Sequence, residues 1–192
     1  MNKSLISIKA ITLSAMFVAI GVVLSFFRIP LSTFTEITLT GLPLAAGACM
    51  LGPWIGFIIG ALIDIVGYIL APKGAFFPGF TISSGLMGVI YGLLLYRNWW
   101  DKREGKNSIL RNKSKGLAIR IVIAHFVKTL AISLCLNCFW LSVFYGMPFK
   151  AVFATSLPKE LINFPIECFL IYLLLCPING YQSFMRKQRD IE

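Results

Sequence analysis

The sequence predicts an all-α membrane protein with six transmembrane helices, and its composition is the main reason. Hydrophobic residues make up 57% of the 192 residues and charged residues only 14%, and the mean hydropathy is +0.80. A soluble domain averages about 25% charged residues, so most of this surface must face lipid. At roughly 20 apolar residues per crossing, the chain accommodates five to seven spans. We therefore treat residues 1–192 as a single transmembrane domain with no room for a soluble catalytic domain.

The first expected span follows a short basic N-terminus and runs to Phe27. It is too long for a signal peptide, and no small-residue cleavage site precedes its end. Ala15 and Ala19 form a small-xxx-small pair, and Gly21 extends this face of small residues. Such faces allow another helix to approach closely, so the pair serves either internal packing or contact with a partner.

Two further spans follow a polar, threonine-rich connection over residues 28–40. The second apolar segment, 41–51, is short for a full crossing, and Gly52-Pro53 then breaks the chain. The third span, 54–70, carries Gly56 and Gly60 four residues apart and a single acid, Asp64.

The next connection, residues 71–80, is apolar and conformationally restricted, unlike an ordinary polar surface loop. Proline fixes φ, and glycine admits conformations that other residues avoid. The residues concerned are Pro72, Gly74, Phe76, Phe77, Pro78, Gly79 and Phe80. We expect this stretch to form a lid or a wall over a site, followed by a fourth span to Tyr96.

The C-terminal half predicts a fifth span over 117–145, a turn over 146–151 and a sixth span over 152–176. The only strongly hydrophilic stretch, 97–115, precedes them and holds seven Lys or Arg against two acids. Basic short loops mark the cytoplasmic side of a membrane. The termini and 97–115 are therefore predicted to be cytoplasmic, and the loops 28–40, 71–80 and 146–151 to face outward. The net charge of +10 thus reflects topology and not a nucleic-acid partner.

Ionisable and polar residues inside spans face a cavity or a partner by default. His125 and Lys128 lie three apart on the fifth span and share a face. Asn137 and Trp140 also lie three apart, nearer the outer end. An amide and an indole could grip a planar heteroaromatic ligand, or could simply form an interhelical bond and an interfacial anchor.

No catalytic or metal-binding set emerges from the sequence. Cys135 and Cys138 match C-x-x-C but lie within a helix, without the βαβ context of a thiol oxidoreductase. An intramembrane aspartyl enzyme needs two acids, and Asp64 is the only aspartate inside a span. His125 lacks companion ligands at metal spacing, and there is no nucleotide-binding G-x-x-x-x-G-K-[ST] motif. We therefore expect neither catalytic residues nor a metal or cofactor.

Several motifs follow one another along the chain: Gly52-Pro53, GALID at 60–64, AFFPGFT at 75–81, GVIYG at 88–92, LNCFWL at 136–141 and PKELINFPIE at 158–167. Together they resemble the folate-type substrate-binding (S) components of energy-coupling factor (ECF) vitamin transporters. The resemblance covers nearly the whole chain, and the FPGFT run is its most specific part.

This resemblance implies a six-helix subunit of the bacterial cell membrane that binds a vitamin from outside and topples to release it inside. The implied partners are the coupling subunit EcfT and the ATPases EcfA and EcfA'. Ala15 and Ala19 match the alanine motif that docks on EcfT. The implied substrate-binding residues are Arg28, Phe77, Gly79, Phe80, Thr81, Asn137, Trp140 and Lys159, with Pro78 in the gate segment.

One position departs from the pattern, because Ser156 stands where family members often carry an arginine. Arginine grips carboxylates bidentately and lysine does not. The departure implies either that Lys159 or Arg28 contacts the acidic groups of folate in place of the arginine, or that the vitamin is another one, such as pantothenate or pyridoxine. A membrane thiol oxidoreductase using Cys135 and Cys138, and an assembly subunit without a ligand, are the competing classes.

Overall fold

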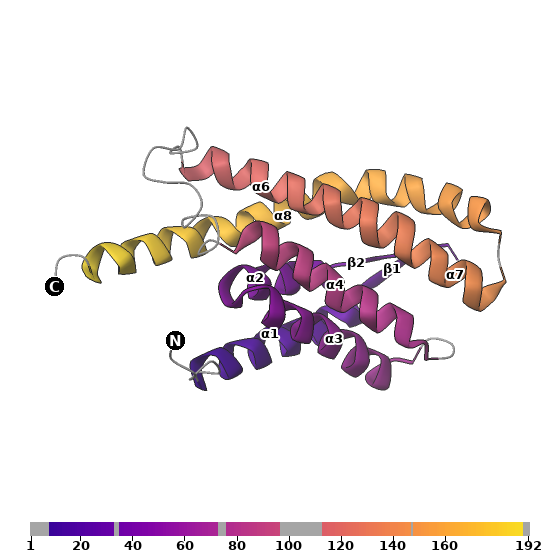
Figure 1. The fold of residues 1–192 in the computed structure, drawn as a ribbon, viewed down its shortest axis with the longest axis horizontal. Coiled ribbons are helices and arrows are strands. Elements are labelled where there is room, and N and C mark those ends of the chain that lie inside the picture. The colour runs from indigo at the N-terminus through magenta and orange to yellow at the C-terminus, as the bar shows by residue number, and fades with distance from the viewer. Residues whose placement is uncertain (1–7, 33–34, 73–75, 97–112, 147, 190–192) are drawn as a thin grey trace.

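The computed structural model describes residues 8–32, 35–72, 76–96, 113–146 and 148–189, which form a helical bundle with one short hairpin (Figure 1). The helices are α1 (Ile8–Phe26), α2 (Gly41–Leu51), α3 (Pro53–Leu70), α4 (Pro78–Leu95), α6 (Lys113–Lys128), η1 (Thr129–Asn137), α7 (Cys138–Tyr145) and α8 (Phe149–Arg189). The strands are β1 (Arg28–Ser32) and β2 (Thr35–Thr38). Because α6, η1 and α7 follow one another without a break, the described residues contain six helical segments, as the sequence predicted.

Four of these segments are long and apolar enough to cross a membrane: Pro53–Leu70, Pro78–Leu95, Gly116–Phe144 and Val152–Pro177. Ala10–Phe26 and Gly41–Leu51 are shorter apolar helices. At about 1.5 Å per residue, the eleven residues of α2 extend roughly half of a 30 Å hydrocarbon layer. In contrast, α8 has 41 residues and is much longer than the predicted span 152–176.

The start of α1 and the end of α8 lie at the same end of the bundle (Figure 1). The start of α4 and the end of α7 lie at the opposite end. We call the end that holds the start of α4 and the end of α7 the distal end. Most of the basic stretch 97–115 lies outside the described residues, and its last three residues begin α6.

Glycine allows α3 and α4 to approach until their backbones touch. A Cβ atom on Gly56 would lie 2.7 Å from the carbonyl oxygen of Gly88, and one on Gly60 would overlap the carbonyl oxygen of Ser84. A Cβ on Gly85 would lie 2.6 Å from the ring of Phe57. Small residues promote such close packing in membranes, where burial from water contributes little between helices. The two helices therefore form a tightly joined pair that fixes the start of α4.

The small residues of α1 do not share one role. Ala15 and Ala19 are exposed, together with the neighbouring side chains of Met16 and Ile20. Gly21 is buried, and a Cβ there would lie 2.7 Å from Cγ1 of Ile63 in α3. The prediction that Gly21 extends the alanine face is therefore wrong, because this glycine serves internal packing.

The connection over 28–40 is more regular than the sequence predicted. Strands β1 and β2 pair antiparallel, with Arg28 opposite Thr38 and Ile29 opposite Ile37. β-Branched threonine and isoleucine favour this extended pairing. Thr38 and Thr40 then share a hydroxyl hydrogen bond of 3.2 Å where the hairpin leads into α2.

Candidate functional site

An aromatic cluster occupies the distal end of the bundle, where the predicted gate meets the fifth span. The ring of Phe77 lies 5.3 Å from that of Trp140 and 5.0 Å from that of Phe144, measured between centroids. Phe80 contacts Phe77 edge-on at 5.8 Å. Such pairs contribute about 0.5–1.5 kcal/mol each beyond the area they bury. The predicted gate residues Phe77 and Phe80 and the predicted binding residue Trp140 are therefore in one cluster.

The gate segment is less loop-like than expected. Helix α4 begins at Pro78, which suits the first turn because its missing N–H needs no partner there. Gly79, Phe80 and Thr81 are consequently helical, and the prediction of a gating loop through residue 80 is wrong at its C-terminal end. Residues 73–75 lie outside the described part of the chain.

Gly79 leaves room for this aromatic cluster. A Cβ atom at residue 79 would overlap the ring of Phe77 and lie 2.7 Å from Cδ2 of Trp140. Two rings would have to move to admit a side chain, so the position requires glycine for reasons of space.

We expect Gly79→Val to weaken ligand binding about tenfold while the protein remains folded, because the branched side chain displaces Phe77 and Trp140. Equilibrium binding and thermal unfolding in detergent measure the two effects. Ile82→Val, one turn further along α4 and exposed, is the matched control. If Gly79→Val binds with unchanged affinity, the start of α4 has a structural role only and does not contribute to ligand binding.

Asn137 and Trp140 carry polar atoms that nothing in the described structure satisfies. Oδ1 of Asn137 and Nε1 of Trp140 are both buried, and neither has a hydrogen-bond partner among the described residues. A buried unpaired polar group costs about 1–3 kcal/mol, so such groups are expected to have a function or an occupant. Together they offer one acceptor and one donor beside the aromatic cluster.

Thr81 is held by the third span. Its hydroxyl donates a hydrogen bond of 2.6 Å to Oδ2 of Asp64. This contact explains the one acid within α3, because it ties the first turns of α4 to that helix.

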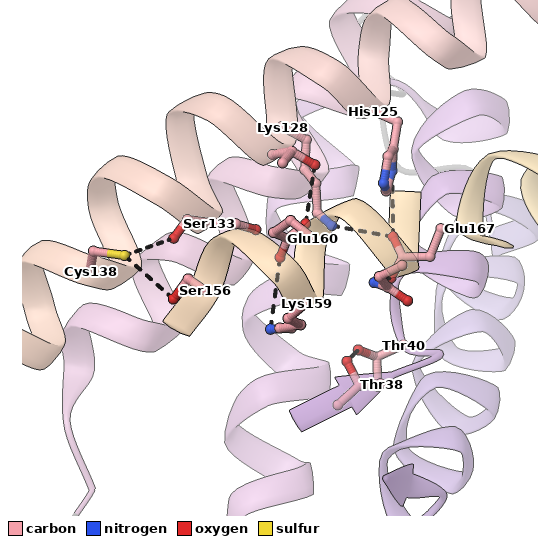
Figure 2. Close-up of polar contacts among 12 residues, drawn as sticks. Thr38, Thr40, His125, Lys128, Ser133, Cys138, Ser156, Lys159, Glu160 and Glu167 are labelled. Atoms are coloured by element: carbon pink, nitrogen blue, oxygen red, sulfur yellow. Dashed lines mark hydrogen bonds and ion pairs between the residues drawn. The ribbon is translucent and has the colours of Figure 1, made fainter. Parts of the chain in front are cut away.

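Lys159 lies in α8 beside a buried acid. Its Nζ is 3.7 Å from Oε1 of Glu160, and Oε2 of Glu160 accepts a hydrogen bond of 3.3 Å from Thr129. Figure 2 shows the contact between Lys159 and Glu160, and shows Ser156 one turn earlier on α8, against Cys138. No cation occupies position 156 to assist Lys159.

A second polar group lies deeper in the bundle, between α4, α6 and α8. Oε2 of Glu167 faces Nζ of Lys128 at 3.2 Å and Nδ1 of His125 at 3.4 Å (Figure 2). Tyr91 lies 3.0 Å from the same His125 nitrogen, and Asn163 donates to Oε1 of Glu167 at 2.7 Å. The charges are thereby paired within the bundle, as an apolar surrounding requires.

Sequence reasoning singled out His125 and Lys128 but did not assign a role to Tyr91 or Asn163. The spacing 160, 163, 167 on α8 is the signal that could have revealed Asn163, because it places all three side chains on one helical face. Tyr91 carried no such signal.

The remaining predicted residues are Arg28, proposed to bind the substrate, and the cysteine pair Cys135 and Cys138. Arg28 lies in β1 opposite Thr38, and its side chain is outside the described part. Cys135 is exposed whereas Cys138 is buried, and the Cys138 thiol contacts the carbonyl oxygen of Ser133 at 3.6 Å. Among the described residues, no three metal-ligating side chains come together.

Comparison with known proteins places this geometry in context. The model of the family described as ECF transporter, substrate-specific component, matches residues 9–175. The folate transporter FolT of Clostridium novyi (strain NT) is 36% identical over 131 residues, which cover 68% of this chain and 67% of that protein. FolT of Leuconostoc mesenteroides subsp. mesenteroides is 26% identical over 176 residues, covering 87% and 84% of the two chains.

Solved structures show the same architecture. The crystal structure of FolT bound with folic acid superposes with a TM-score of 0.73 at 31% identity, over 90% of this chain and 98% of that one. The S component of a bacterial ECF transporter superposes with a TM-score of 0.65 at 20% identity, over 91% and 97%. The second match supports the fold alone.

Proposed function

Because this chain belongs to the substrate-specific components of ECF transporters, we propose that it is the folate-binding subunit of such a transporter. The family is a transport component, so the chain is a multi-pass membrane subunit and not an enzyme. A substrate-specific component works with an ECF module that supplies the energy. The observation that carries the choice of site is the buried, unpaired pair formed by Asn137 and Trp140.

The chemistry of this pair fits the pterin ring of folate. A pterin has a flat aromatic face and an edge that carries both hydrogen-bond donors and acceptors. Oδ1 of Asn137 would accept from that edge, and Nε1 of Trp140 would donate to it. The Phe77 ring, 5.3 Å from Trp140, would cover the bound molecule from the gate side. The names of the similar proteins also favour folate over pantothenate or pyridoxine.

The carboxylates of folate require a cation, and Lys159 is the best-placed candidate on the described side chains of α8. Its ammonium group lies 3.7 Å from the buried carboxylate of Glu160, and the Lys159 side chain remains partly exposed. Arg28, at the start of β1, is a second candidate. With Ser156 offering no charge, we propose that these two residues take the role.

The size of folate is sufficient for tight binding without special chemistry. About 32 heavy atoms at roughly 0.3 kcal/mol each give about 9.6 kcal/mol, which corresponds to a Kd just below about 100 nM. A few polar anchors in a largely apolar site supply the orientation.

We further propose that the termini face the cytoplasm, in line with the basic residues concentrated in 97–115. The distal end, with the aromatic cluster, then faces outward, where the vitamin is captured. Ala15 and Ala19 would contact EcfT, and EcfA and EcfA' would hydrolyse ATP while the subunit topples to release folate inside. The exposure of both alanines on α1 supports this contact.

Mass spectrometry of the small molecule that co-purifies with the protein tests the proposed substrate. We expect a folate to be released upon denaturation in about equimolar amount. Recovery of another vitamin would replace folate while retaining the class, and a preparation without any ligand that fails to bind added vitamins would favour an assembly subunit.

A further inference from the structure

The fifth span contains a nine-residue π-helix, η1, between the α-helical segments α6 and α7. π-Helices are rare and occur most often at functional sites. This one ends at Asn137, three residues before Trp140, so it immediately precedes the two residues proposed to bind the ligand. We therefore ask how the π-helix affects the orientation of Asn137 and Trp140.

The π-helix changes which side of the span is buried. Before it, buried residues follow the usual spacing of three or four, at Ile121, Ala124, His125 and Lys128. Ile132 continues this spacing from Lys128, but beyond it the buried positions are Leu134 and Cys138, whereas Cys135 is exposed and Phe139 is 50% exposed. Continued α-helical spacing from Lys128 and Ile132 would instead bury positions 135 and 139. The end of the span is thus rotated relative to its start, and this rotation sets the direction of Asn137 and Trp140.

Both ends of the π-helix are attached to α8. At its start, Thr129 donates to Oε2 of Glu160 at 3.3 Å, and the preceding Lys128 contacts Glu167 at 3.2 Å. Just after its end, the Cys138 thiol lies 3.7 Å from the Ser156 hydroxyl. Figure 2 shows the contact of Lys128 with Glu167 and that of Cys138 with Ser156. A wide helical turn that is held at both ends has a fixed rotation.

Glu160 connects this arrangement to the proposed cation of the site. One carboxylate oxygen accepts from Thr129 and the other faces Lys159 at 3.7 Å. The same buried acid therefore holds both the start of the π-helix and the neighbouring ammonium group.

We propose that Thr129 and Glu160 are positioning residues, which fix the rotation of the π-helix and so hold Asn137 and Trp140 in their binding orientation. This inference rests on the proposed function of the two binding residues. It assigns to Thr129 and Glu160 no contact with the ligand.

A double-mutant cycle tests the proposal, with folate affinity of the purified protein as the readout. We expect Thr129→Val to weaken binding about tenfold and Thr129→Ser, which keeps the hydroxyl, to restore it. In the Asn137→Ala background, Thr129→Val should cost clearly less than in the wild type, about threefold, because one of the two residues that it orients is gone. Thr12→Val removes an exposed hydroxyl that bonds within α1 and should leave affinity unchanged.

Each other outcome has a defined meaning. If Thr129→Val weakens wild type and Asn137→Ala by the same factor, Thr129 acts on general stability and the proposal is wrong. Wild-type affinity in Thr129→Val contradicts it as well. If Asn137→Ala alone binds folate as tightly as wild type, the proposed binding site itself fails, and the positioning role falls with it.

Discussion

Replacing Trp140 with alanine should weaken folate binding by about 30- to 1000-fold while the protein stays folded. Buried tryptophans at the centre of a binding site commonly contribute 2–4 kcal/mol. Trp140 also contacts Phe77 at 5.3 Å, so its loss removes both a ring face and the support of the gate. Asn137→Ala should cost about 10- to 100-fold, because the ligand then buries a donor without a partner.

Matched controls come from the same turns of the helix. Val143→Ala truncates a side chain that is 61% exposed, one turn after Trp140. Cys135→Ser changes an exposed residue close to Asn137. Both should retain wild-type affinity in fluorescence titrations, and the thermal unfolding curves should match. Wild-type affinity in Trp140→Ala would exclude this end of the span as the binding site.

Placing a tryptophan at Ala15 or Ala19 should abolish folate uptake by cells while leaving folate binding intact. Both alanines are exposed on α1, so a bulky side chain meets no resistance within this subunit. It would instead hold the coupling subunit away from the helix, because close approach in a membrane requires small residues. Uptake of labelled folate and binding by purified protein measure the two effects separately.

Ile20→Trp is the control for bulk alone, because Ile20 is also exposed and lies about 100° or more around α1 from both alanines. We expect it to support uptake. If the alanine substitutions destroy binding as well, the alanines belong to the internal packing of the subunit. If uptake persists, the partner docks on another surface.

Much of the helical architecture follows directly from the sequence. The Gly52-Pro53 break gives the turn between α2 and α3, where Gly52 adopts a φ of 95° that other residues avoid. The glycines of the third and fourth spans allow these helices to pack closely, and a Cβ atom on Gly56 would lie 2.7 Å from the carbonyl oxygen of Gly88. Apolar composition and small-residue spacing are local signals, and the membrane leaves few other ways to satisfy the backbone.

The remaining features depend on tertiary contacts that a single sequence does not display. Gly21 resembles the exposed alanines by spacing, but the position of Ile63 on α3 makes it internal. The π-helix contacts α8 through Thr129 and, just beyond its end, through Cys138, and no local sequence pattern predicts it. Asn137 and Trp140 each carry a buried polar atom without a partner among the described residues, but their joint role in binding stays a prediction, and the sequence does not predict the π-helix before them.

Calorimetric titration of the purified subunit with folate, in the absence of ATP and of partner subunits, tests the central claim most directly. The account predicts one site per chain and a Kd just below about 100 nM, with no comparable heat from pantothenate or pyridoxine. Protein from which the co-purified ligand has been removed should bind added folate with the same affinity. A folded, ligand-free preparation that produces no heat with folate would contradict the account.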